Sequence, residues 1–317
     1  MALSDMKVFN DFMYTTVTET LDQQIDLFNA ASNGAIVLRS ARNVGDYMDE
    51  AFYKAFSTQA RRRDAYGSGA VAAQDLSQEA HTSVKIAGAN GPFAFNPSQF
   101  TWIQRNPEEA AVAIGEQVAQ AILQDYLNTG IGAARAAIVN NGLAYDGTAG
   151  TLTLNSLNKG AALFGDKSGD IQVWVAHSKA YHDLIDAGLT NANRLFQFGD
   201  VQIIQDQAGR PILVSDIPAL LISGSPNEYQ TLGLSTGGVI VEDNGDFFAN
   251  AETTNGDENI ARTWQSEYTY NLKLKGFSWD KVNGGVSPDD TDLFTGTNWD
   301  KVASFDKDTA GVAVRTD

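Results

Sequence analysis

Three histidines, His81, His177 and His182, are the side chains whose ordinary pKa lies near neutrality, which suits a general base or a metal ligand. Two of them share the segment 177–183 with Ser178 and Asp183, so a hydrolytic or metal site is one hypothesis. Five positions separate these two histidines, which places them on different faces of a helix, whereas a zinc-binding helix carries its histidines four apart. We therefore favour a structural interpretation, in which His177 ends a strand and Ser178 caps a helix.

The rest of the chain offers no recognised catalytic or cofactor motif. It has no cysteine, which excludes disulfides, thiolate nucleophiles and cysteine-bound metals. It also lacks a Gly-x-Ser-x-Gly elbow, a phosphate-binding loop and a dinucleotide fingerprint. Five aspartates without calcium-loop spacing are interpreted as acidic surface: Asp166, Asp170, Asp289, Asp290 and Asp292. We predict a protein that is not an enzyme, with no catalytic residues, cofactor or metal.

One basic cluster, formed by Arg61, Arg62 and Arg63, interrupts a chain with 39 acidic and 22 basic residues and a formal charge of -17. So acidic a chain lacks the basic surface of a nucleic-acid reader. Arginine forms paired hydrogen bonds with carboxylates as well as with phosphates, and carboxylates are plentiful here. The cluster therefore favours contact with another protein subunit. Lys85 is interpreted as a solvated lysine in preference to a cross-linking one.

Two long elements must position these residues. A helix is predicted over 107–140, with Asn106 as its cap and Pro107 in its first position, and it would be roughly 50 Å long. Unbroken alternation predicts a strand over 260–275, also roughly 50 Å long. Gly130 favours a bend in the helix. Rods of equal length suggest a flat, elongated subunit that buries surface against copies of itself.

The N-terminal segment predicts an amphipathic helix with Ser4 as its cap and Asn33-Gly34 as its stop. Its apolar stripe either packs on the subunit's own core or lies, as an arm, on a neighbouring subunit. The stripe consists of Met6, Phe9, Met13, Val17, Leu21, Ile25 and Phe28.

The remaining segments are shorter. Residues 57–102 predict a long two-stranded excursion that needs a partner surface, with 88–92 between its strand-like parts. The tail from Gly284 is polar, with Trp299 and Val302 as anchors. No secretory signal and no membrane span are expected. Helices are predicted over 157–164 and 178–187, and strands over 36–39, 171–176, 201–205, 212–215, 220–223, 229–234, 239–242 and 247–251.

Several motifs resemble one branch of the major capsid proteins of tailed bacteriophages. They are 61–69 (RRRDAYGSG), 100–103 (FTWI) before 106–109 (NPEE), 174–179 (WVAHSK) and 209–216 (GRPILVSD). The order of elements agrees with this shell fold, which encapsulins and the herpesvirus capsid floor share. The resemblance implies an α+β fold with four parts. These are an N-terminal arm (1–34), an extended loop (57–102), a peripheral domain (35–56, 103–166 and 252–283) and an axial domain (167–251 and 284–317).

The same resemblance implies a shell protein that assembles as pentamers and hexamers into the icosahedral head of a tailed phage, in the host bacterial cytoplasm. The head would enclose double-stranded DNA without sequence-specific binding or any membrane. A separate scaffolding protein, a portal and a decoration protein are further candidate partners. The residues expected to contact neighbouring subunits are Arg61, Arg62, Arg63, Tyr66 and Lys85 from the loop, and Phe9, Met13, Val17 and Leu21 from the arm.

Two other hypotheses stay open. An encapsulin-like compartment would enclose a cargo enzyme in place of DNA. An enzyme would have its site around His177 and Asp183.

Overall fold

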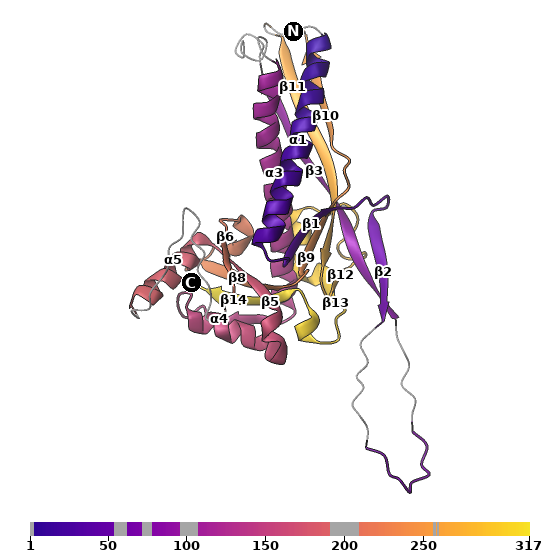
Figure 1. Ribbon diagram of the computed structural model, residues 1–317, viewed down its shortest axis with the longest axis vertical. Helices are drawn as coiled ribbons and strands as arrows, with labels where there is room; N and C mark the ends of the chain where they lie inside the picture. Colours follow the sequence, from indigo (N-terminus) through magenta and orange to yellow (C-terminus); the bar gives the residue numbers. More distant parts are fainter. Residues whose placement is uncertain are drawn as a thin grey trace.

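Two β-sheets and two long helices organise the chain in the computed structural model (Figure 1), which describes residues 3–53, 62–71, 78–95, 107–190, 209–255, 258 and 260–317. The longest elements run side by side and form an elongated body, with the second sheet beside it and a hairpin projecting from it. They are α1 (Leu3–Ala31), α3 (Pro107–Asn140), β3 (Gln78–Phe95) and β11 (Ala261–Leu274). The predicted α+β class is confirmed.

Helix α1 ends and helix α3 begins where the sequence predicts. Helix α1 begins at Leu3, so the predicted cap Ser4 lies inside the helix. The backbone turns left-handed at Asn33 (φ 52°) and Gly34 (φ 72°), which ends α1, because these residue types adopt that conformation most readily. Helix α3 begins at Pro107; the predicted cap at 106 lies outside the described residues. It stays continuous through Gly130, so the helix has no break there. A Cβ there would lie 2.9 Å from Val239 Cγ1, so this glycine permits close packing on the sheet.

The eight-stranded sheet lies against these helices. Its order is β1-β9-β11-β12-β13, while β10 and β3 also pair with β11, and β2 pairs with β3. Apolar side chains of β11 and β9 share one core with α1 and α3. The other strands are β1 (Ile36–Ser40), β2 (Tyr47–Tyr53), β9 (Val239–Asp243), β10 (Phe248–Thr254), β12 (Phe277–Trp279) and β13 (Trp299–Lys301).

The six-stranded sheet has the order β4-β14-β8-β5-β6, with β7 paired to β8. One face meets α3, and the other packs on short helices around Trp174. Its strands are β4 (Ala144–Asp146), β5 (Ile171–Ala176), β6 (Ile212–Val214), β7 (Leu221–Ile222), β8 (Glu228–Ser235) and β14 (Gly311–Thr316). The short helices of the chain are α4 (Leu154–Ala161), α5 (Ser178–Thr190), α6 (Asp290–Leu293), η1 (Ala162–Asp170), η2 (Pro218–Leu220), η3 (Gly296–Asn298) and η4 (Asp306–Asp308).

Residues 88–92 do not separate two strands, as the sequence suggested, but belong to the single strand β3. A Cβ at Gly88 would lie 2.4 Å from Tyr268 Cζ, so this glycine makes room for a ring across the strand pair. The register shifts between Trp264 and Ser266, which absorbs the irregularity as a bulge. From Val84 onward β3 pairs with β11, so only the first part of 57–102 together with β2 projects from the sheet.

The C-terminal segment joins both sheets. Strand β13 pairs with β12 in the eight-stranded sheet, whereas β14 pairs with β8 and β4 in the other. The sequence analysis assigned 284–317 to one domain and did not predict β4, β13 or β14, because strands of three to six residues are too short to show a clear period. The predicted strand at 201–205 lies outside the described residues, and β6 pairs in parallel with β5.

Candidate assembly surfaces

The β2–β3 hairpin has a firmly held base. The two strands pair from Tyr47–Val84 to Tyr53–Gln78. Lys281 Nζ lies 2.7 Å from the Asp49 carboxylate. Glu50 on the neighbouring position pairs with Lys273 of β11. The base is therefore fixed to the body, while the far end extends away from it (Figure 1).

The far end of this hairpin, residues 62–71, presents charge and aromatic surface outward. Arg62 and Arg63 are exposed, and the Tyr66 side chain is 99% exposed. Asp64 Oδ1 accepts a hydrogen bond from the Tyr66 amide at 3.0 Å, which forms a local turn. Arg61 lies outside the described residues. The predicted contact residues Arg62, Arg63 and Tyr66 thus lie together on a protruding turn.

Lys85 lies elsewhere than predicted. It is a half-buried residue of β3 opposite Asn271 of β11, and its amide donates to the Asp46 carbonyl at 2.9 Å. It therefore belongs to the body of the sheet and not to the projecting end.

The stripe of α1 faces the subunit's own core. Met13, Val17 and Leu21 are buried in the core that α3 also lines. The prediction that these three residues contact a neighbouring subunit is therefore wrong, because buried side chains leave no surface for another subunit. The side chain of Phe9 lies outside the described part. Thr16 approaches Gly115 so closely that a Cβ on the glycine would lie 3.1 Å from Thr16 Cβ.

Among the described side chains of α1, the exposed aromatic residues are Phe12 and Tyr14. The Tyr14 ring lies 5.9 Å from that of Phe247, before β10, so it extends an apolar edge along the long body. Sequence reasoning missed both residues because they fall beside the regular three-and-four spacing of the stripe.

The half-buried carboxylate of Asp125 ties α3 to β11. Tyr268 donates its hydroxyl to Asp125 Oδ2 at 2.8 Å, and Tyr270 lies 3.2 Å from the same oxygen. Burial raises the pKa of the Asp125 carboxyl above its ordinary value, while the tyrosine hydrogen bonds act in the opposite direction. The folded protein therefore binds this proton more readily than the unfolded chain does.

We expect Asp125→Asn to gain stability relative to the wild type as pH rises. Between the ordinary and the raised pKa the folded wild type holds the extra proton, so its free energy of unfolding falls as pH rises through that window. Asparagine keeps an acceptor oxygen for the tyrosines without a charge to bury. Urea unfolding of both proteins from about pH 4 to about pH 8 measures the difference.

Asp216→Asn is the control, because the pKa of Asp216 is shifted in the opposite direction from that of Asp125. The hydrogen bond from Ser178 lowers the pKa of Asp216, so its stabilising contribution is present above the ordinary pKa and is lost on acidification. The free energy of unfolding of this variant should fall further below that of the wild type as pH rises. A pH-independent difference for Asp125→Asn would contradict our account of that carboxylate.

The histidine segment forms helix-capping contacts. His177 Nδ1 accepts a hydrogen bond from the Lys179 amide at 3.1 Å, and Asp216 accepts one from the Ser178 amide. The cap is thus His177 and not Ser178. Asp183 pairs with Lys179 on the same helix at 2.6 Å. The residues of the enzyme hypothesis are engaged in separate local contacts.

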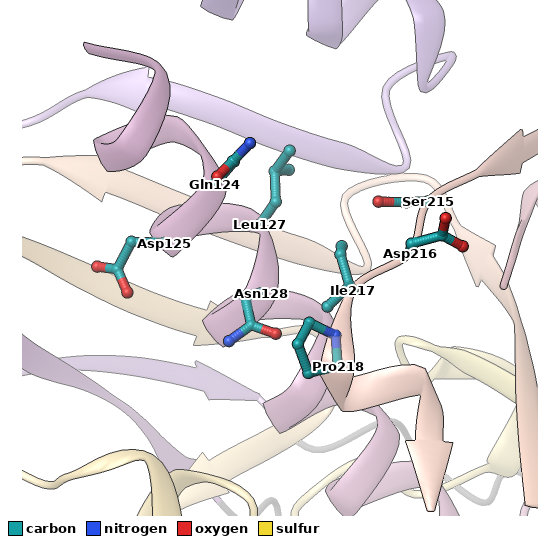
Figure 2. Close-up of a pocket in the computed structure, with 8 residues that line it drawn as sticks. All are labelled: Gln124, Asp125, Leu127, Asn128, Ser215, Asp216, Ile217 and Pro218. Atoms are coloured by element: carbon teal, nitrogen blue, oxygen red, sulfur yellow. The ribbon is translucent and has the colours of Figure 1, made fainter. Parts of the chain in front are cut away.

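A pocket of about 450 Å³ lies between α3 and residues 215–218 (Figure 2). Asp125 and Asp216 line it, but their carboxylates point away from each other. Asn128 Oδ1 is buried without a hydrogen-bond partner. Within the described residues, no group of three or more histidines, aspartates or glutamates converges as a metal site. None of the described helices combines the length and apolar character that crossing a bilayer requires.

Comparisons with known proteins agree with this architecture. The family model of major capsid protein 13-like (Gp13-like) proteins matches residues 5–313. The capsid of cyanophage Pam1 has a TM-score of 0.52 and 13% identity, covering 89% of this chain and 88% of that chain. The acid-stable capsid of Helicobacter pylori bacteriophage KHP30 has a TM-score of 0.51 and 8% identity, covering 91% and 89%.

An encapsulin has a similar fold. The holo-SrpI encapsulin complex from Synechococcus elongatus PCC 7942 has a TM-score of 0.52 and 11% identity, covering 88% of this chain and 84% of that chain. At these identities the likeness shows the fold. No curated protein matches the sequence. Because the family model spans nearly the whole chain and the fold agrees with it, the chain belongs to the major capsid protein 13-like family and is a phage shell protein.

Proposed function

We propose that copies of this chain, arranged in pentamers and hexamers, form the closed icosahedral head of a tailed bacteriophage. The observation that carries the proposal is the projecting β2–β3 hairpin (Figure 1). Its described outer end, residues 62–71, is exposed, while its base is held by ion pairs, so no surface of its own subunit covers that end. Such an element gains its stabilisation from a neighbouring subunit.

The side chains at the hairpin end suit a partner surface that is rich in carboxylates. Arg62 and Arg63 are exposed beside a tyrosine, and arginine with tyrosine is a combination enriched in protein interfaces. The partner in this proposal is another copy, because each copy brings 39 acidic residues. Many such contacts, each modest, add to a stable shell.

The enclosed molecule in this proposal is double-stranded DNA. A chain of charge -17 offers few phosphate contacts, so counterion release would not fasten the genome to the wall. The shell would contain DNA without reading its sequence. Assembly would take place in the host bacterial cytoplasm, with a separate scaffolding protein, a portal and a decoration protein as partners.

An encapsulin-like compartment is the second candidate, since an encapsulin shares the fold to a similar TM-score. Expression of the full chain, alone and with the scaffolding protein of its phage, followed by electron microscopy tests the proposal. We expect closed particles. A strictly monomeric protein at high concentration in both cases would overturn it. Nuclease-protected DNA inside virions supports the phage head, whereas a protein cargo in place of DNA supports the compartment.

A further inference from the structure

A second pocket, of about 410 Å³, lies at the base of the β2–β3 hairpin. Ile240 of β9 lines it. The neighbouring residues Val239 and Val241 face the core beneath α1 and α3, so Ile240 lies on the opposite face of the eight-stranded sheet. The pocket therefore lies on the face of the sheet that these helices do not cover. Val302 and Ala303 give it an apolar wall.

Two carboxylates, Glu50 and Asp308, and two lysines line the pocket, and Asp308 is paired with Lys167 outside it. The two lysines differ in their partners. Lys273 is paired with Glu50 across the sheet. Lys275 Nζ has only neutral partners, Ser235 Oγ at 3.3 Å and the Thr236 carbonyl at 3.2 Å. Within the described part of the chain no carboxylate is in ion-pair contact with Lys275. A half-buried ammonium group in so acidic a protein attracts a carboxylate from outside its own subunit.

His81 also lines this pocket. The side chain is only 7% exposed, and its Nε2 lies 2.9 Å from the Leu274 carbonyl, so Nε2 carries the hydrogen and donates it. Nδ1 is buried without a partner. Burial lowers the pKa of His81, which keeps the ring neutral near pH 7 and leaves Nδ1 as an acceptor. Because Nδ1 has almost no accessible surface, the His81 ring contributes a neutral wall to the pocket.

The pocket thus fits a segment that carries an aliphatic side chain and a carboxylate close together. The exposed loop after β12 carries both. Val286 is 60% exposed, and Ser287 and Asp290 are also exposed. Asp289 is already engaged, because it accepts a hydrogen bond from the Asp292 amide at 2.9 Å. Trp279 donates to the Gly285 carbonyl at 3.1 Å, which fixes the base of the loop and leaves Val286 outward.

We propose that residues 286–290 of one copy occupy this pocket in a second copy. Val286 packs on Ile240 and Val302, and the Asp290 carboxylate pairs with Lys275. Different surfaces meet in this contact, so it links copies into a ring or lattice and not into a closed pair. The inference rests on the proposed function, because it requires copies that assemble.

The absence of cysteine allows a direct test by disulfide trapping. In assembled shells of the Val286→Cys/Val302→Cys variant, oxidation should give covalent dimers and larger multiples on a non-reducing gel, because a disulfide requires Cα atoms within about 7 Å. Each single variant should stay monomeric on the gel. The matched control is Val44→Cys/Val302→Cys, since Val44 is also highly exposed and lies near an acidic residue, Asp46.

Shells of the double variant that give no covalent products, or no more than the Val44 control, would overturn the proposal. Absence of shells from the wild type would instead count against the proposed function, so the two failures are distinguishable. Charge exchange gives a second test, which does not need oxidation. Lys275→Glu and Asp290→Lys should each raise the protein concentration for half-maximal assembly by about tenfold, and their combination should restore it. Folded variants whose combination restores nothing would also overturn the proposal.

Discussion

The double variant Arg62→Glu/Arg63→Glu is expected to fold as the wild type does and to form no closed shells. Both arginines are exposed on the protruding turn, so their replacement leaves the core of the subunit unchanged. Reversing a charge against a carboxylate partner costs several kcal/mol per contact, about 2–5 kcal/mol when the pair is desolvated. The cost recurs at every copy in the shell. Sedimentation and electron microscopy of the purified variant measure the loss.

Two controls accompany this experiment. Arg62→Lys/Arg63→Lys keeps the charge and should retain partial assembly, because lysine loses only the paired geometry of arginine. Arg42→Glu reverses an exposed charge in the turn after β1, away from the hairpin end, and should assemble. Wild-type yields of shells from the double glutamate variant would show that the hairpin end does not carry the contact.

Trp299→Ala should lower the free energy of unfolding by about 3–5 kcal/mol. Trp299 is fully buried, its ring centre lies 4.9 Å from that of Trp279, and its Nε1 donates to the Leu293 carbonyl at 2.9 Å. It fastens the segment after Gly284 to the eight-stranded sheet through β13. Alanine leaves a cavity and an unsatisfied carbonyl. Urea unfolding followed by circular dichroism measures the change.

Trp299→Phe separates packing from hydrogen bonding, since it keeps an aromatic ring and loses the donor, and it should cost less than the alanine variant. Val282→Ala is the surface control, because Val282 is 89% exposed, and it should change stability by about 0.5 kcal/mol or less. A loss below about 1 kcal/mol for Trp299→Ala would contradict the anchoring role.

The long elements were predictable because their signals repeat over many residues. Helix α3 begins at the predicted Pro107 and ends at the predicted Asn140. Strand β11 lies within one residue of the predicted ends, and its buried face includes Trp264, Tyr268 and Tyr270 as the alternation required. Repeated burial on one face leaves a clear pattern in the sequence.

Glycines were harder to interpret, because a glycine marks either a turn or a close approach. Gly88 was assigned to a boundary between strands, whereas it lies beneath the ring of Tyr268. Gly130 was expected to bend a helix, whereas it lets the helix meet Val239. Each distinction depends on a partner distant in sequence, which periodicity does not reveal.

The assembly surface was only partly predictable for a similar reason. The hairpin end was found from its arginines and its lack of apolar residues. The stripe of α1 could pack on its own subunit or on a neighbour, and the pattern is the same in both cases. In the structure, Met13, Val17 and Leu21 are buried, which shows that the stripe packs on the subunit's own core. The pocket beside Lys275 and His81 is lined by residues of strands β2, β3, β9 and β11, so no local sequence motif predicts it.

Limited trypsin digestion, performed on assembled shells and on dissociated subunits, tests most directly whether a neighbour covers the hairpin end. Trypsin cleaves after arginine, and Arg62 and Arg63 lie on the exposed turn. We expect rapid cleavage there in dissociated subunits and cleavage at least about tenfold slower in shells, because the covered turn must first open. Equal cleavage rates in the two states would contradict the account.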